Sequence, residues 1–201
     1  MRDRVLPEIV QALWKREPLL QPGEPWQPDL DGRIGKLQPE RWIDGDANKL
    51  QYAQAVQSGL YLWNDSLNAS HELSQRITNE TGSYLHGMMH RMEGDYPNAS
   101  YWFRTAGSHP VASRIQNRVQ SLVSGHKTID KPNSLMNELI HLSEQSEWNP
   151  VYFTALVERA CEAPESTVVR TLQAVQRIEV VLLLEYSYQV CCEESIFDYI
   201  V

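Results

Sequence analysis

The C-terminal stretch from about Pro164 to Gln189 constrains the fold more than any other part of this sequence. Apolar residues recur there at helical spacing, at Val168, Leu172, Val175, Ile178 and Leu182. From Ile178 to Leu184 they lie nearly all round the helix, which is typical of a helix that neighbours cover on every side. We therefore expect a bundle of helices with this last and longest helix at its centre.

Helical periodicity recurs along most of the remaining chain. The sequence predicts helices over residues 6–16, 46–63, 66–77, 111–123, 134–144 and 150–161, and a pair of helices within residues 83–110. Almost nothing alternates with period two, so strands are not needed to explain the pattern. We predict an all-α fold: a single-domain helical bundle of about eight or nine helices.

The first 45 residues differ in composition from the rest. After the first predicted helix, residues 17–45 contain five prolines and four glycines, so neither a helix nor a strand can run far there. We expect residues 1–45 to form a helix and an irregular arm packed on the body, pinned by Trp26 and Trp42, and residues 46–201 to form the helical domain. Residues 125–133 read as a loop.

Charge and composition exclude several classes of function. The formal charge of the 201-residue chain is −8, and no run of basic residues is present, so nucleic acid is a poor partner. The longest apolar run, 180–184, is too short to cross a bilayer, and no signal-like start appears, so we expect a soluble cytoplasmic protein without a membrane partner. The three cysteines, Cys161, Cys191 and Cys192, lack zinc-ligand spacing and read as reduced thiols. Nucleotide-binding glycine loops and GxSxG elbows are absent.

Candidate functional residues concentrate between Ser83 and Pro110. His86 and His90 stand four residues apart, and Glu93 follows three residues later, so all three lie on one stripe of a helix. Imidazole and carboxylate groups at this spacing predict a divalent metal site for zinc, iron or manganese. The preceding predicted helix offers His71 as a further ligand. Glu72 from that helix, or Asp95 from the central block, is a candidate base or orienting group.

A structural interpretation of the same helix competes with the metal site. Leu85 and three methionines, Met88, Met89 and Met92, form an apolar stripe about a third of a turn away from the histidines. If this stripe alone faces the core, the histidines lie at its edge. If the histidines are buried as well, they must be paired or ligated. His109 and Glu179 are further candidates for the site, and Arg91 is expected to pair with a neighbour such as Asp95.

Part of this block resembles one tetratricopeptide or Sel1-like repeat. The resemblance rests on Gly94-Asp95-Tyr96, followed by Ala99, Phe103 and Ala106, with Gly87 earlier in the chain. It implies two helices joined by a tight turn, with Gly87 and Ala99 allowing their close approach. The chain departs from the repeat at His86 and His90, where the pattern has large apolar and aromatic residues.

A longer run, HxxxHRxExDYxNAxYWFRxxGxHP from His86 to Pro110, resembles an uncharacterised family of bacterial hypothetical proteins, over residues 47–190 in all. The resemblance implies no activity, but it implies that seven residues belong together: His71, His86, His90, Glu93, Asp95, Asn98 and His109.

Two function hypotheses from different classes follow. The first is a small metal-binding protein, acting as a metal-dependent hydrolase or oxidase on a small-molecule substrate, with metal ligands His71, His86, His90 and Glu93 and with Glu72 and Asp95 as catalytic groups. The second is a tetratricopeptide-like module that binds a peptide or protein partner without catalysis. A cofactor-free enzyme with a histidine base is not distinguished from the first by sequence.

Overall fold

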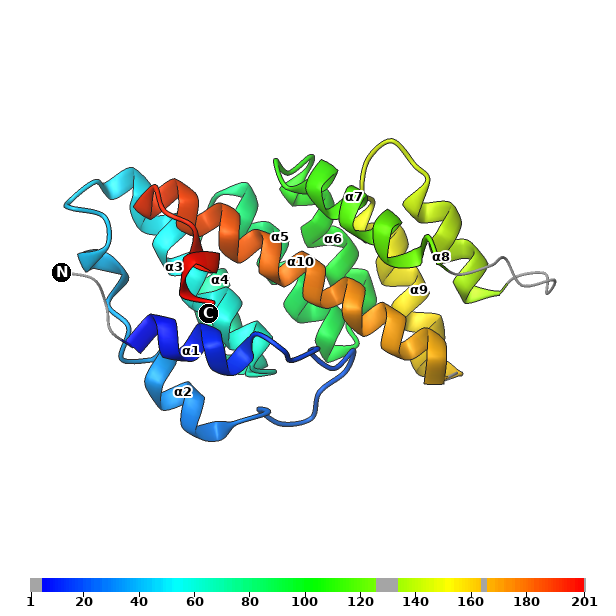
Figure 1. Cartoon of the computed structure of the whole chain (residues 1–201), viewed down its shortest axis with the longest axis horizontal. Coiled ribbons are helices and arrows are strands. Elements are labelled where there is room, and N and C mark those ends of the chain that lie inside the picture. Colours follow the sequence, from blue (N-terminus) through cyan, green and yellow to red (C-terminus); the bar gives the residue numbers. More distant parts are fainter. Residues whose placement is uncertain (1–4, 126–133, 164–165, 201) are drawn as a thin grey trace.

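The computed structural model describes residues 5–125, 134–163 and 166–200 (Figure 1). These residues form ten α-helices and two short 3-10 helices, without a strand: α1 (Val5–Leu13), α2 (Pro28–Ile34), η1 (Pro39–Arg41), α3 (Ala47–Trp63), α4 (Leu67–Ser74), α5 (Glu80–Glu93), α6 (Tyr96–Ala106), α7 (Ala112–Val123), α8 (Leu135–Ser143), α9 (Pro150–Glu162), α10 (Ser166–Cys192) and η2 (Ile196–Tyr199). The all-α prediction is confirmed. The additional helix is α2, which lies within the predicted irregular arm. The expected loop at 125–133 falls almost wholly outside the described residues, as does Pro164.

The bundle is arranged around its C-terminal helix. Figure 1 shows α10, in orange, crossing the body diagonally, with α3 and α4 near one end and α8 and α9 near the other. Helix α10 packs against α3, α5, α7, α9 and η2. Its segment 179–185 is buried throughout, so the prediction of a central C-terminal helix is confirmed.

Helix α5 is buried as completely as the middle of α10. Every residue from Thr81 to Met92 is buried, including the methionine stripe and the histidine stripe. The structure therefore decides between the two interpretations of this helix, because α3, α4, α6 and α10 pack around it and both stripes lie inside. The histidines are among the residues that must find partners.

Local signals in the sequence fix where the functional helices begin and end. The Asn79 side chain accepts a hydrogen bond from Gly82 N at 3.0 Å and caps α5, and Asp95 caps α6 in the same way. Gly94 ends α5 in the left-handed conformation, with φ +83°, which glycine adopts without strain. The tight turn between α5 and α6 therefore follows from two caps and one glycine.

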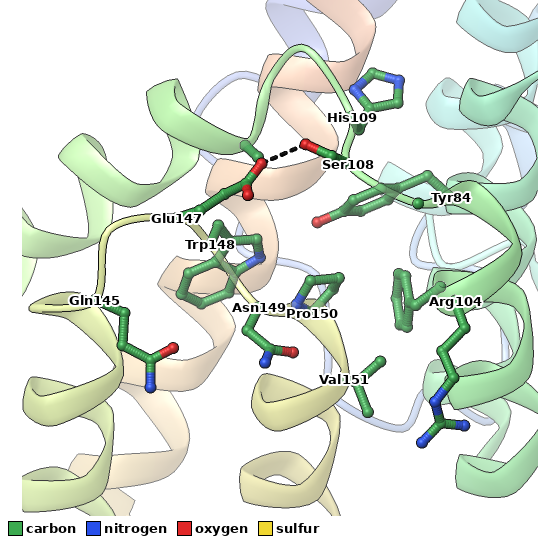
Figure 2. Close-up of a pocket in the computed structure, with 13 residues that line it drawn as sticks. Tyr84, Arg104, Ser108, His109, Gln145, Glu147, Trp148, Asn149, Pro150 and Val151 are labelled. Carbon is green, nitrogen blue, oxygen red and sulfur yellow. Dashed lines mark hydrogen bonds between the residues drawn. The ribbon is translucent and has the colours of Figure 1, made fainter.

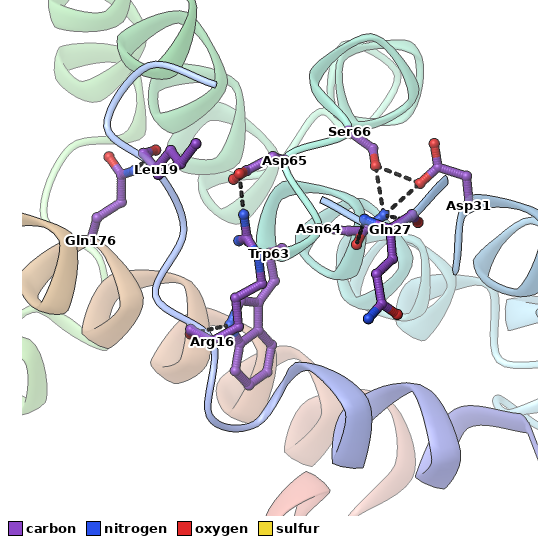
Figure 3. A network of polar contacts seen from close by, with 9 residues as sticks. All are labelled: Arg16, Leu19, Gln27, Asp31, Trp63, Asn64, Asp65, Ser66 and Gln176. Atoms are coloured by element: carbon purple, nitrogen blue, oxygen red, sulfur yellow. Dashed lines mark hydrogen bonds and ion pairs between the residues drawn. The ribbon is translucent and has the colours of Figure 1, made fainter. Parts of the chain in front are cut away.

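Polar contacts tie the N-terminal arm to the end of α3 (Figure 3). The Arg16 guanidinium forms an ion pair with Asp65 and donates a hydrogen bond to Trp63 O at 2.6 Å. The Asn64 amide donates to Gln27 O and to Asp31 Oδ1, each at 2.9 Å. These contacts hold the arm beside the turn between α3 and α4. Helix α4, which begins after this turn, carries His71.

Candidate metal centre

Three histidine side chains from two helices meet inside the bundle. His71 comes from α4, and His86 and His90 come from successive turns of α5. The ring centroids of His86 and His90 are 4.7 Å apart, and that of His71 lies 4.8 Å from the first and 5.3 Å from the second. One ring nitrogen of each histidine lies within 4.8 Å of those of the other two. The structure thus brings together three of the four ligands predicted from the sequence.

Small residues on the helix faces allow this convergence. Ser58 of α3 and Ser70 of α4 are fully buried, and their Oγ atoms lie 3.0 Å apart, so α4 packs closely on α3 and His71 reaches α5. On the other side, a Cβ atom at Gly87 would stand only 2.9 Å from the Phe103 ring. Glycine at position 87 lets α6 approach α5, and α6 then covers the histidines.

The His86 ring has no hydrogen-bond partner. Both of its nitrogens are buried and unbonded, and the ring is stacked between Trp102, 4.1 Å away, and His90, with interplanar angles of 19°. Burial, together with the nearby rings of His90 and His71, lowers the pKa of His86 to about 4. The ring is therefore neutral near pH 7 and keeps an unshared lone pair. Each unbonded buried polar atom costs about 1–3 kcal/mol, so this arrangement requires an explanation.

The His90 ring is oriented by two neighbouring side chains. The Glu93 Oε2 atom lies 3.1 Å from His90 Nδ1, and the Asn98 Nδ2 atom, from α6, lies 3.1 Å from His90 Nε2. Burial lowers the pKa of His90, and His71 acts in the same direction, while Glu93 and Asp95 oppose the shift. The contact with the carboxylate assigns the proton of the neutral ring to Nδ1. This leaves Nε2 as the nitrogen that can bind an ion.

The ring nitrogens of the three histidines are farther apart than the ligand nitrogens of a bound zinc ion, but not by much. Zinc bonds to imidazole nitrogen of about 2.0–2.1 Å in tetrahedral geometry place ligand nitrogens roughly 3.4 Å apart. The nitrogens here lie within 4.8 Å of one another, so side-chain rotations would have to close the site. His71 is partly exposed, and the Asn98 amide must leave His90 Nε2 before that nitrogen can bind an ion.

None of the three predicted carboxylates, Glu72, Glu93 and Asp95, belongs to the group of converging ligand atoms. Glu93 contacts His90, and its role as a direct ligand stays a prediction. Glu72 is exposed on α4, and Asp95 is exposed where its side chain accepts a hydrogen bond from Asn98 N at the start of α6. Their proposed catalytic roles also stay predictions.

His109 and Glu179 belong to other parts of the structure. The His109 Nε2 atom lies 2.9 Å from Thr81 Oγ1, and the ring contacts Tyr84 and Tyr186, with centroids 5.6 and 5.1 Å away. His109 also lines a separate cavity of about 340 Å³, with Tyr84 and Trp148 (Figure 2). Burial lowers its pKa to about 4.

Glu179 forms a buried network that the sequence did not reveal. The Arg91 Nη2 atom donates to Glu179 Oε2 at 2.5 Å, and Tyr84 and Trp148 donate to Oε1 at 2.8 and 2.9 Å. The expected pairing of Arg91 with Asp95 is wrong, because Arg91 points into the core toward α10 and Asp95 lies at the surface. Gln176, which accepts a hydrogen bond from Arg91 Nε at 3.2 Å, stands one turn before Glu179. Two polar residues three positions apart in an otherwise apolar helix were the sequence signal that could have indicated a buried polar network on α10.

An acidic cavity of about 380 Å³ adjoins the histidine cluster. Its wall includes Glu93, Asn68 from the first turn of α4, and Glu24 and Asp31 from the arm. Because Glu93 also contacts His90, this carboxylate separates the cavity from the rings. The negative lining favours the approach of cations over anions.

Comparisons with known proteins supply no family. No family model, no curated protein and no solved structure matches the chain. The resemblances drawn from the central block stay predictions. Among the described residues, no helix is long and apolar enough to cross a membrane.

Proposed function

We propose that the protein binds one divalent transition-metal ion through ring nitrogens of His71, His86 and His90. The observation that carries the proposal is His86, whose two nitrogens are buried without partners although its ring is in contact with two other imidazoles. A bound ion would satisfy one of these nitrogens and account for the convergence of the rings. Three protein ligands leave a coordination position open, as in catalytic rather than structural zinc sites.

The donor set favours zinc or iron(II) over manganese. The converging atoms are all imidazole nitrogens, which suit zinc and iron, whereas manganese prefers carboxylate, carbonyl and water oxygens. The nearest placed carboxylate, Glu93, contacts His90 instead of joining the set. Burial lowers the pKa of His86 to about 4 and also lowers the pKa of His90, so these two rings give up no proton when they bind an ion near pH 7.

The surrounding residues prepare the site for chemistry. Glu93 holds the proton on His90 Nδ1, and Trp102 shields the face of His86 from solvent. The acidic cavity on the other side of Glu93 has room for a small molecule, which would reach the rings only if the Glu93 side chain moved aside. A bound ion supplies Lewis acidity and lowers the pKa of a coordinated water. We propose a metal-dependent hydrolase or oxidase, with Glu72 and Asp95 as candidate bases from the surface side.

The alternative of a repeat-like interaction module has less support. Such a module needs an exposed surface on its paired helices, but α5 is buried along its whole middle. The hairpin of α5 and α6 has the predicted tight turn. It serves to bring Trp102 and Asn98 over the histidines.

Elemental analysis of protein purified without a metal-affinity tag tests the proposal. We expect about one zinc or iron per chain, and a melting temperature that falls on treatment with a chelator and recovers when the metal is returned. His86→Ala and His71→Ala should each lose the metal. The matched control is His141→Ala, because His141 is an exposed histidine on α8 and should retain it.

Two results would overturn the proposal. One is the absence of stoichiometric metal after growth with added zinc and iron, together with a melting temperature that no divalent ion changes. The other is metal content in His86→Ala equal to that of His141→Ala.

A further inference from the structure

A groove on another part of the molecule has apolar walls and two arginines. Its volume is about 690 Å³, larger than either cavity described above. Helices α7 and α10, the 3-10 helix η2 and the residue after α1 form it, and it shares no residue with the histidine cluster. The lining residues are Trp14, Arg118, Ser121, Leu122, Arg177, Ile178, Val181, Leu182, Phe197 and Ile200.

Neither arginine has an acidic partner in the described part of the chain, since Arg118 and Arg177 take part in no ion pair there. The Arg177 guanidinium is half-buried, donates a hydrogen bond to Trp14 O, and lies 4.8 Å from the centroid of the Trp14 ring. The acid whose charge acts on Arg177 is Glu17, which lies beyond ion-pair distance. Arg118 is exposed at the rim.

Two arginines without an acidic partner thus stand beside apolar walls in a chain with a net charge of −8, and the contacts of the Arg177 guanidinium are Trp14 O and the rings of Trp14 and Trp63. A partly buried charge is normally paired, because its desolvation is otherwise uncompensated. Seven of the ten lining residues are apolar, and the side chains that can donate a hydrogen bond to a polar group are the two arginines, Ser121 and the indole N–H of Trp14. A ligand that fits this pattern has an alkyl body and one anionic head.

We propose that this groove binds one free fatty-acid molecule, with the carboxylate on Arg118 and Arg177 and the alkyl chain along Ile178, Val181 and Phe197. The volume lies within the range of about 300–1,000 Å³ that is typical of small-molecule sites. A peptide fits less well, because its backbone groups would lack partners on these walls. An anionic membrane surface fits less well, because it presents many charges at once and only two arginines stand here to offset the repulsion from a net charge of −8.

Calorimetric titration of the full-length protein with dodecanoate, below its micelle-forming concentration, tests this inference. We expect saturable binding with one molecule per chain. The uncharged analogue dodecanol has the same alkyl chain, and we expect it to bind at least about tenfold more weakly, because it lacks the charge-assisted hydrogen bonds. Equal binding of the two ligands, or no saturable binding of dodecanoate, would overturn the proposal.

Variants locate the binding in the groove. Arg118→Gln removes an exposed charge that has no ion-pair partner in the described part of the chain, and it should weaken dodecanoate binding about tenfold. Ser121→Trp should abolish it by filling the groove. The matched control is Arg114→Gln, one turn earlier on α7, which is exposed outside the groove and should bind like the wild type. Affinities of Arg118→Gln and Ser121→Trp equal to that of the control would exclude the site.

A parallel titration with vesicles containing phosphatidylglycerol separates the free ligand from a membrane. We expect no binding to these vesicles. Binding to the vesicles without binding to monomeric dodecanoate would replace the proposed ligand by a lipid surface.

Discussion

Helix α5 carries two buried polar clusters that differ in how their atoms are satisfied. On one face, Arg91 meets Glu179, which also accepts hydrogen bonds from Tyr84 and Trp148. On another face, His86 and His90 meet His71, and both nitrogens of His86 are unbonded. The residues His90 and Arg91 are neighbours in the chain, so the difference comes from what packs against each face.

The comparison distinguishes a structural cluster from a candidate site. Most polar atoms of the arginine cluster find partners within the protein, and the remaining Nη1 of Arg91 lies in a guanidinium packed over the rings of Phe103 and Phe153. The histidine cluster leaves lone pairs that nothing in the described chain uses. A protein interior keeps such groups when another molecule or ion completes them.

The largest effect is expected from breaking the arginine cluster. Glu179→Ala leaves the Arg91 guanidinium buried without its counter-charge, so the free energy of unfolding should fall by about 3–5 kcal/mol. Urea denaturation monitored by circular dichroism measures this loss. The loss should be the same with and without a chelator, because the cluster is structural.

A double variant supplies the control for that experiment. Arg91→Met with Glu179→Leu removes both charges and should recover most of the stability. A double variant as unstable as Glu179→Ala would show that lost packing, and not the unpaired charge, explains the effect.

The second prediction is a pH dependence of stability caused by the buried His109. His109 has a pKa of about 4 in the folded state because of burial, below the ordinary value of 6.5. Between these values the unfolded chain binds a proton that the folded chain does not, so stability is full above pH 6.5 and falls as the pH drops toward 4. The expected loss reaches about 3 kcal/mol for this residue in metal-free protein.

Denaturation at a series of pH values measures the loss, with His109→Gln as the comparison. His86 contributes in the same direction in both proteins, so the variant should show a shallower decline rather than none. Identical pH profiles for the two proteins would contradict the assignment to His109.

The third effect is on metal affinity. Glu93→Gln removes the carboxylate that orients His90, so the affinity for zinc should fall about 10- to 100-fold. Competition with a chromophoric chelator measures it, and Glu162→Gln, at an exposed end of α9, is the control that should change nothing. An affinity unchanged by Glu93→Gln would remove this residue from the site.

The smallest predicted effect is a gain in stability instead of a loss. In metal-free protein, His86→Leu replaces two unbonded buried nitrogens by an apolar group of similar size, so stability should rise by about 1 kcal/mol. With metal present the wild type should be more stable than His86→Leu, because only the wild type is stabilised by binding the ion. A variant that is less stable than the wild type under metal-free conditions would mean that His86 has an unrecognised partner within the protein.

Local signals explain the parts of the molecule that could be predicted. Asn79, Asp95 and Asn149 cap helices that the sequence predicted, and Gly94 ends α5. The stripe of His86 and His90 follows from helix geometry alone. The short helix α2 was missed because its seven residues lie between prolines and glycines, and its stability comes from contacts with the body.

The remaining features depend on contacts between distant parts of the chain. Arg91 and Glu179 are 88 residues apart, and no local pattern shows that α10 supplies the partner. His109 lies in the same motif as His86, but it contacts Thr81 instead. Residues of one sequence motif are close along the chain, but they belong to one site only if the fold also brings their side chains together.

The sequence by itself determined that this chain is helical, where most of its helices begin and end, and that two histidines share one face of one helix. Those properties depend on interactions within a few residues. Only the tertiary structure decided that this face is buried, that His71 from another helix meets it, and that Glu179 belongs to a different cluster. Burial and partnership depend on how the helices pack, because packing sets which polar atoms lose water and which of them find a replacement.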